Sequence, residues 1–239
     1  MLKGVIAKLL PLIYKAFPRM FSTSIILGRM IPAKTILDVG CGEGGTFNWL
    51  KRIDKLLSLN KMAAYTVGLD IYGPSLRKAR VYKVYNDVVN ADARFLPFRE
   101  RSFDVCTAFE VIEHLAKPYA YKCLRELNRV AKRQVIITTP VMEIIQPPSE
   151  YSENVFQKHR SAWHPEEMKK LGFKVIGLRG IKKIFGEARQ SGVDYSVKHP
   201  LFKPLVIFIK KMSCLIVYYY PNIAHQQLCI KMVKDEYHD

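Results

Sequence analysis

From residue 34 onward, the sequence alternates between short apolar segments and longer segments with helical periodicity. The apolar segments are expected to be strands: "TILDVG", "YTVGLDI", "DVVNAD", "SFDVCTAF" and "QVIITTP". Between them, "GTFNWLKRIDKLLSLN", "GPSLRKARVYKVY" and "PYAYKCLRELNRVA" are expected to be helices; the first places Phe47, Leu50 and Ile53 on one face. Strands that are apolar throughout and alternate with helices are typical of a parallel sheet covered on both faces. The alternation therefore predicts an α/β fold.

The first expected strand runs into a glycine-rich turn, "ILDVGCGEGG", at residues 36–45. Such a turn presents backbone N–H groups and the positive end of the following helix to a ligand. A nucleotide phosphate loop needs a Gly-Lys-Ser/Thr ending, and this turn continues as Gly-Thr-Phe, so we reject that interpretation. A nicotinamide dinucleotide stays open. Its sites place an acid about 20 residues past the glycines, and Asp70 closes the second strand 30 positions after Gly40.

The ends of the later strands favour a different ligand. In parallel sheets, ligands bind beyond the carboxyl ends of the strands, so the residues that close each strand carry the information. Four segments stand in order over roughly residues 35–178: "ILDVGCGEGG", "GLDIYGPSL", "NADARFLPFRERSFDVCTAFEVIEHL" and "QKHRSAWHPEEMKKLGFKVIG". Together they resemble the class I S-adenosylmethionine-dependent methyltransferases, specifically the type 11 group that includes quinone-biosynthesis enzymes.

The resemblance implies a Rossmann-like three-layer sandwich, in which a seven-stranded, mostly parallel sheet has an antiparallel last strand and helices on both faces. The sequence pattern divides the chain into an N-terminal helical cap at 1–33 and a methyltransferase domain at 34–239, where the alternation begins. The cofactor-binding half is 34–141 and the acceptor-side half is 142–239. An apolar insertion at about 180–224 separates the last two strands. We expect it to be a cap, an interface or a membrane-facing helix; a buried or dimer helix is the alternative.

The resemblance also implies S-adenosylmethionine as the cofactor. The residues that would bind it are Asp38, Gly40, Cys41, Gly42, Gly44, Asp70, Ile71, Tyr72, Asp92, Ala93, Phe109 and Glu110. The glycines would let the backbone approach the methionine half of the cofactor, because a Cβ there would clash. Asp38 would help hold the loop and the cofactor's ammonium group.

The remaining residues would bind the nucleoside and the methionine chain. Asp70 would accept hydrogen bonds from both ribose hydroxyls, since a carboxylate offers two oxygens. Ile71 and Tyr72 would pack on the adenine. Asp92 and the Ala93 N–H would bind the polar edge of the adenine, while Phe109 and Glu110 would lie under the methionine portion. For Asp70 and Asp92, turn or capping duty is the alternative, because it is common for Asp.

The candidate catalytic residues are Glu113, His114 and His159, in "EVIEHL" and "QKHRSAW". Glu110, Glu113 and His114 have i, i+3, i+4 spacing, so a helical turn would put them on one side. A base is needed only if the acceptor must lose a proton on methyl transfer. Two carboxylates and two imidazoles could also hold a divalent cation. We predict no metal, and a helix cap with its paired partner is the alternative for Glu113 and His114.

The net charge of +17 favours anionic partners such as nucleic acid, anionic lipid or acidic metabolites. No acid precedes Asp38, and a second acid-poor stretch runs from 195 to 234. We expect a methyltransferase for a small or lipid-like acceptor, with possible membrane-surface contact. The alternatives are an RNA methyltransferase, which no recognisable RNA-binding module supports, and a non-catalytic partner subunit that binds S-adenosylmethionine. The oligomeric state is not predicted.

The five cysteines are odd in number and form no CxxC pair, so neither a disulfide framework nor a zinc site is expected. A reducing cytoplasm fits this pattern. The lysine-interrupted apolar N-terminus lacks a signal-peptide cleavage site, and no stretch has about 18 uncharged apolar residues, so we expect no transmembrane helix.

Overall fold

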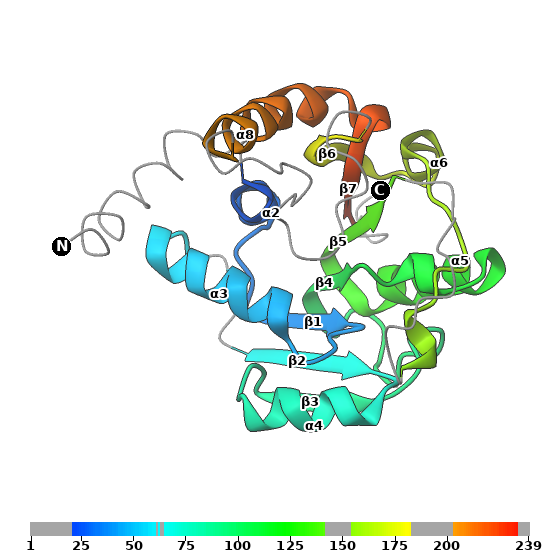
Figure 1. The fold of residues 1–239 in the computed structure, drawn as a ribbon. Helices are drawn as coiled ribbons and strands as arrows, with labels where there is room; N and C mark the ends of the chain where they lie inside the picture. Colours follow the sequence, from blue (N-terminus) through cyan, green and yellow to red (C-terminus); the bar gives the residue numbers. More distant parts are fainter. Residues whose placement is uncertain (1–20, 61, 63–64, 142–153, 183–202, 234–239) are drawn as a thin grey trace, which may run out of the picture.

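The computed structural model describes residues 21–60, 62, 65–141, 154–182 and 203–233 (Figure 1). Most of the predicted N-terminal cap, residues 1–20, lies outside this part of the chain. So do residues 183–202 of the predicted insertion. The division into a cap and a domain stays a prediction.

The sheet has seven strands in the order β3-β2-β1-β4-β5-β7-β6. The strands are β1 (Thr35–Val39), β2 (Tyr65–Asp70), β3 (Asp87–Asn90), β4 (Phe103–Phe109), β5 (Ala131–Pro140), β6 (Lys174–Ile181) and β7 (Ala224–Met232). The first five run parallel, while β7 lies antiparallel between β5 and β6. The predicted mostly parallel sheet with an antiparallel last strand is therefore confirmed.

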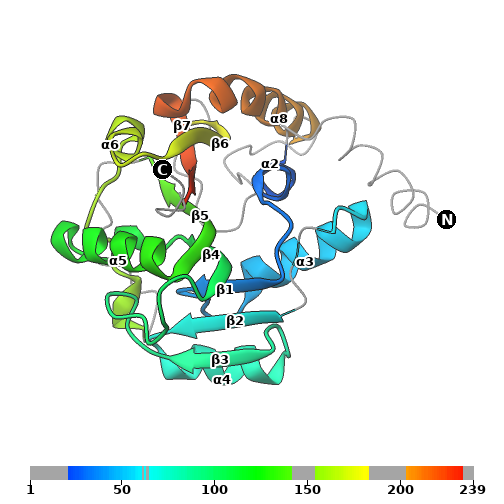
Figure 2. The same ribbon diagram turned by 180° about the vertical axis from the view of Figure 1, so that it is seen from behind.

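Helices cover both faces of this sheet, which makes three layers (Figures 1 and 2). The α-helices are α2 (Ser22–Arg29), α3 (Gly45–Leu57), α4 (Gly73–Val81), α5 (Lys117–Val130), α6 (Pro165–Lys170) and α8 (Lys203–Tyr219). Short 3-10 helices are η2 (Ile112–His114), η3 (Val155–Gln157) and η5 (Pro221–Ile223). The predicted helices are present, although α3 and α4 end a few residues earlier than the periodicity indicates.

Two hydrophobic cores lie on opposite faces because successive strand residues point to opposite sides. Ile36 and Ile136 join the core that α2, α3 and α4 cover. Their neighbours Leu37 and Ile137 join the core that α5 and α6 cover. Helix α3 enters the first core with buried residues at Phe47, Leu50, Ile53 and Leu57, as its helical spacing predicts.

The predicted insertion contains α8, which packs across β6 beside α2 (Figure 1). A Cβ at Gly177 in β6 would lie 2.0 Å from the Val217 carbonyl oxygen, so glycine permits this close approach. The Lys211 ammonium lies 4.5 Å from the centre of the Phe21 ring, at the start of α2. Arg29 in α2 also donates a hydrogen bond to the Tyr218 hydroxyl. Within the part of the chain described, no helix has the length and apolarity needed to cross a membrane.

Candidate active site

The glycine turn between β1 and α3 is built from left-handed backbone. Gly40, Gly42 and Gly44 have φ angles of 69°, 53° and 86°, a region that glycine enters without the steric cost of a Cβ. A Cβ at Gly40 would also lie 2.4 Å from Cγ2 of Val111. At Gly42 a Cβ would meet no atom within 4 Å, so there the φ angle, and not contact within the protein, accounts for glycine.

Asp70 at the end of β2 joins this turn to the next strand. Its Oδ2 accepts a hydrogen bond from the Gly42 N–H at 2.8 Å, and its Oδ1 accepts one from the Tyr72 N–H at 2.8 Å. A carboxylate has about four lone-pair positions, so each oxygen can still accept a hydroxyl. Asp70 therefore both fixes the turn and offers acceptors at the tip of β2.

A cavity of about 290 Å³ lies beyond the carboxyl ends of the strands, where α/β sheets bind ligands. Seven of the predicted residues line it: Gly40, Asp70, Ile71, Asp92, Ala93, Glu110 and His114. The others are not among its described lining residues: Asp38, Cys41, Gly42, Gly44, Tyr72, Phe109, Glu113 and His159.

Asp38 lies beneath the turn, 3% exposed. Its two oxygens accept hydrogen bonds from the Tyr85 hydroxyl, at 2.6 Å, and from the Thr107 hydroxyl, at 2.7 Å. Burial raises the pKa of Asp38 to about 6, although both hydrogen bonds act in the opposite direction. These contacts support its predicted role in holding the loop; its predicted contact with an ammonium group stays untested.

Asp92 follows β3 and forms a two-pronged ion pair with Arg94. The Arg94 Nε donates to both Asp92 oxygens, at 3.0 and 2.8 Å, and Nη2 donates to Oδ2 at 2.5 Å. Partial burial disfavours the charged carboxylate, but the hydrogen bonds and charge of Arg94 outweigh it and lower the pKa of Asp92. Asp92 therefore lines the cavity as an anion that already holds one partner.

Glu110 borders two cavities. It follows β4 with a left-handed φ of 55°, and its Oε1 accepts a hydrogen bond of 2.7 Å from Gln226 Nε2 in β7. A second cavity of about 270 Å³ lies on its other side. That cavity is lined by residues from α2, α3 and the tips of β4 to β7: Ser22, Thr23, Ile26, Thr46, Trp49, Leu50, Phe109, Glu110, Thr138, Arg179 and Gln226.

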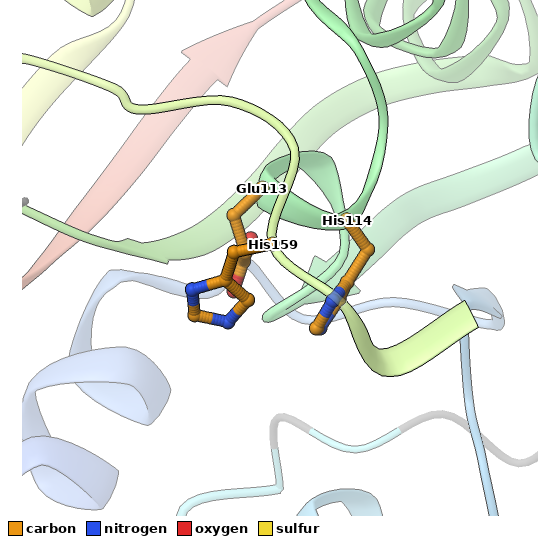
Figure 3. Close-up of side chains that lie close together, drawn as sticks. All are labelled: Glu113, His114 and His159. Carbon is orange, nitrogen blue, oxygen red and sulfur yellow. The ribbon is translucent and has the colours of Figure 1, made fainter. Parts of the chain in front are cut away.

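The three predicted catalytic side chains lie together (Figure 3). Glu113 and His114 come from η2, and His159 comes from the segment that crosses in front of it. The two imidazole rings meet edge to face, with centroids 4.8 Å apart. One ligand atom from each residue lies within 4.8 Å of the others. The predicted helical turn from Glu110 to His114 does not form, because the left-handed φ of Glu110 is incompatible with a right-handed helix. Glu110 is therefore not a member of this group.

Burial keeps these groups mostly uncharged. Glu113 is 2% exposed, and its burial, together with the nearby charge of Glu110, raises its pKa well above the usual range. Burial and the neighbouring His159 lower the pKa of His114 to about 4. Burial also lowers the pKa of His159, although the negative charge of Glu110 acts to raise it. At neutral pH both imidazoles are therefore proton acceptors.

The same group offers donors that fit a divalent cation. The Thr139 hydroxyl donates to Glu113 Oε2 at 3.0 Å, while Glu113 Oε1 and His114 Nδ1 have no hydrogen-bond partner among the described residues. Two imidazoles and a carboxylate are a common donor set for transition metals. The geometry is compatible with a cation as well as with a base, so the prediction of no metal stays a prediction.

Several lining residues were missed by sequence reasoning. Arg94 follows the predicted Ala93 directly, so the strand-end rule could have included it. Asn154, Phe156 and Arg160 approach from the segment before α6. Arg179 and Gln226 come from β6 and β7, where no local motif marks them.

Comparison with known proteins identifies the domain. Residues 37–138 match the family model described as a methyltransferase domain. This range begins in β1, ends in β5 and contains the glycine turn and the tips of β2, β3 and β4.

Each of three relatives matches about half of the chain. An uncharacterized protein of Methanocaldococcus jannaschii is 34% identical over 58% of this chain and 49% of its own length. The cycloartenol-C-24-methyltransferase of Arabidopsis thaliana is 36% identical over 42% of this chain and 29% of its own length. A probable tRNA methyltransferase 9B of Homo sapiens is 32% identical over 48% of this chain and 22% of its own length. The chain thus spans less than half the length of each relative.

A solved structure extends the similarity to nearly the whole fold. A methyltransferase of Haloferax volcanii, in complex with the Trm112 methyltransferase activator, superimposes with a TM-score of 0.55. The match covers 97% of this chain and 96% of that one at 16% identity, which shows a shared fold. The matched family model and the cavity at the strand tips identify residues 37–138 as a methyltransferase domain of the S-adenosylmethionine-dependent type 11 group.

Proposed function

We propose that this protein transfers a methyl group from S-adenosylmethionine to a small or lipid-like acceptor by in-line displacement. The observation that carries the proposal is that two cavities share Glu110 as a border. The first is lined by Asp70, Asp92 and Gly40 of the glycine turn and suits the cofactor. The second, which α2 helps to line, offers the acceptor an approach to the reacting end of the cofactor.

The cofactor contacts follow from the residues at the strand tips. Asp70 would accept hydrogen bonds from the ribose hydroxyls, with Ile71 against the adenine. The Asp92 carboxylate would share the adenine amino group with Arg94, and Ala93 lies beside it in the lining. Glu110 would lie near the methionine portion. Cys41, Gly42, Gly44, Tyr72 and Phe109 would shape this site from behind.

The transfer itself depends mainly on alignment. The acceptor's nucleophilic atom forms a bond to the methyl carbon while the carbon–sulfur bond breaks, and the electron pair returns to sulfur. Positioning two reactants in this way can supply about 7–11 kcal/mol. If the acceptor is a hydroxyl or amine, the neutral imidazole of His114 or His159 would take its proton. Glu113, buried behind them, would position these rings.

The test is transfer of a labelled methyl group to fractionated lipid, RNA and small-molecule pools. We expect label in the lipid or small-molecule pool, and less transfer with His114→Gln. The control is His164→Gln, since His164 is an exposed histidine at the start of α6. Cofactor binding without transfer to any pool would instead favour a non-catalytic partner subunit.

Because the pKa of His114 is about 4, transfer should keep most of its rate between pH 8 and pH 6 and decline only at lower pH. An ordinary imidazole, with a pKa of about 6.5, would already be half protonated at pH 6.5. A midpoint near pH 6.5 in the pH–rate profile would therefore remove His114 as the base. The profile should be recorded with and without a chelator, because an activity lost with the chelator would favour a metal at this group.

RNA is the second candidate acceptor. The net charge of +17 and the similarity to a probable tRNA methyltransferase favour it. In that case label would enter the RNA pool, and binding would weaken steeply as salt rises, because phosphate contacts release counterions.

We further propose that the exposed face of α8 contacts an anionic membrane surface. Phe208, Met212, Ile216 and Tyr219 are 59, 41, 49 and 61% exposed, and α8 contains no acidic residue. Exposed apolar and aromatic side chains on a basic helix are typical of interfacial binding. Such a contact would bring a lipid-like acceptor to the domain.

Vesicle co-sedimentation tests this contact. Vesicles with anionic lipid should bind the protein, and Phe208→Ser/Ile216→Ser should reduce binding at least tenfold. The matched control is Val81→Ser/Phe95→Ser, which changes two exposed apolar residues, 75 and 59% exposed, away from α8. Equal binding by both double variants would contradict the proposal.

A further inference from the structure

The second cavity contains an arginine to which the methyltransferase fold alone assigns no role. Arg179 from β6 lines this cavity together with Glu110, Gln226 and Thr138. Thr138, Arg179 and Gln226 lie in β5, β6 and β7, and Glu110 directly follows β4. The cavity therefore lies where the ends of these four strands meet. A cation in that position can determine which ligands enter.

A bulge in β6 directs Arg179. Leu178 pairs with Gln226 and Ile181 pairs with Ala224, so two residues of β6 oppose one residue of β7. Arg179 and Gly180 both adopt left-handed φ angles, 66° and 80°. This region is unfavourable for an arginine and persists only where the surrounding structure imposes it.

Helix α8 supplies that constraint. The Ile181 N–H donates to Ser213 Oγ at 3.3 Å, and the Ser213 hydroxyl donates to the Lys210 carbonyl at 2.8 Å. A Cβ at Gly180 would lie 2.6 Å from the same Ser213 oxygen. Residues outside the cavity thus hold the strained turn that presents Arg179 to it.

Within the described residues, the Arg179 guanidinium forms no hydrogen bond or ion pair. Glu110, the carboxylate in the same lining, accepts its hydrogen bond from Gln226 instead. Arg179 acts on its surroundings through its charge, which opposes the rise in the pKa of Glu113. Its five N–H donors in a planar fork remain available for a carboxylate or a phosphate.

Apolar side chains form another part of the cavity wall. Ile26, Trp49, Leu50 and Phe109 supply it, from α2, α3 and β4. We infer that the second cavity is an anion-binding subsite, in which Arg179 pairs with a carboxylate or phosphate of a ligand whose apolar part lies against this wall. The inference rests on the proposed function for the identity of its ligand, which is either an acidic acceptor or the carboxylate of the cofactor itself.

Calorimetric titrations with two pairs of probes distinguish these two candidate ligands. S-adenosylhomocysteine and its decarboxylated analogue test the cofactor's carboxylate. Decanoate and decanol test an acidic acceptor with an apolar chain. The variants are Arg179→Gln and Arg179→Asn, the second because Asn tolerates a left-handed φ and preserves the fold. Arg80→Gln, an exposed arginine on α4, is the control.

For an acidic acceptor, the wild type should bind decanoate at least tenfold more tightly than decanol, and both Arg179 variants should lose this preference. For the cofactor's carboxylate, the variants should bind S-adenosylhomocysteine at least tenfold more weakly and its decarboxylated analogue equally well. Either result supports the subsite. If Arg179→Asn is folded and leaves the affinities for both pairs of probes unchanged, the inference is wrong. If the wild type fails to bind S-adenosylhomocysteine at all, the proposed function fails instead.

Discussion

The two halves of this sheet are built from the sequence in different ways. In the half made of β1 to β4, each candidate cofactor residue lies at or just after the end of a strand, within a short motif. In the half made of β5 to β7, the cavity next to Glu110 draws on segments from Ser22 to Gln226. A cavity at the strand tips can therefore be encoded in short local motifs, whereas a cavity lined by distant segments depends on the assembled fold.

The largest expected effect is on the glycine turn. Gly40→Ala should destabilise the protein by about 2–4 kcal/mol, from left-handed strain and overpacking, because its Cβ would lie 2.4 Å from Val111. Gly45→Ala is the matched control, since its Cβ would meet no atom within 4 Å. Thermal unfolding and titration with S-adenosylhomocysteine measure both. Equal behaviour of the two variants would contradict the account of the turn.

Asp70→Ala should weaken binding of S-adenosylhomocysteine by about 1–3 kcal/mol, through the loss of hydrogen bonds to a charged acceptor. Asp87→Ala is the control. Asp87 is the first residue of the adjacent strand β3, so it lies away from the strand tips, and it accepts a hydrogen bond from the Tyr65 hydroxyl. Calorimetry gives the affinities. Unchanged affinity with Asp70→Ala would remove Asp70 from its assigned role.

Asp38 should make the stability of the wild type depend on pH. Its pKa is about 6 in the folded protein and near 3.8 when unfolded, so the folded state binds more protons between these values. Stability from this group is therefore lost as pH rises from about 4 through 6, by about 1–3 kcal/mol. The lowered pKa of His114 makes stability rise with pH, which is the opposite effect. The measurement is therefore the difference in unfolding free energy between wild type and Asp38→Asn. A difference that does not vary with pH would contradict this pKa.

The smallest expected effect is on the contact between the two halves. Gln226→Met removes the hydrogen bond to Glu110 and should reduce the free energy of unfolding by about 0.5–1.5 kcal/mol. The affinity for S-adenosylhomocysteine should change less than twofold, because the ribose and adenine contacts lie in the other cavity. If this variant weakens cofactor binding as much as Asp70→Ala does, the separation of the two halves is wrong.

The sequence predicted the strands, the sheet and seven residues of the first cavity's lining, because strand-end residues and glycines carry their geometry locally. It did not reveal that Asp38 is buried under the loop, since a strand's last residues alone do not show which face they occupy. The spacing of Glu110, Glu113 and His114 predicted a shared helical face, and the left-handed Glu110 prevents that.

Residues contributed from a distance were beyond sequence reasoning. Arg179 reaches the second cavity only because a bulge opposes two residues of β6 to one of β7, and α8 holds that bulge. Trp163 is fully buried in the core that α5 and α6 cover, and its indole N–H donates to the Ser161 hydroxyl. The pairing of β6 with β7, which a long insertion separates in the sequence, determines the position of Arg179. No short sequence motif indicates this pairing.

The measurement that tests the central claim most directly is a crystal structure with S-adenosylhomocysteine. We predict that the ligand lies in the crevice at the strand tips, with its ribose hydroxyls on Asp70, its adenine beside Asp92 and Ala93, and its amino acid chain at Glu110. An empty crevice at saturating ligand, or a nucleoside bound away from Asp70, would contradict it.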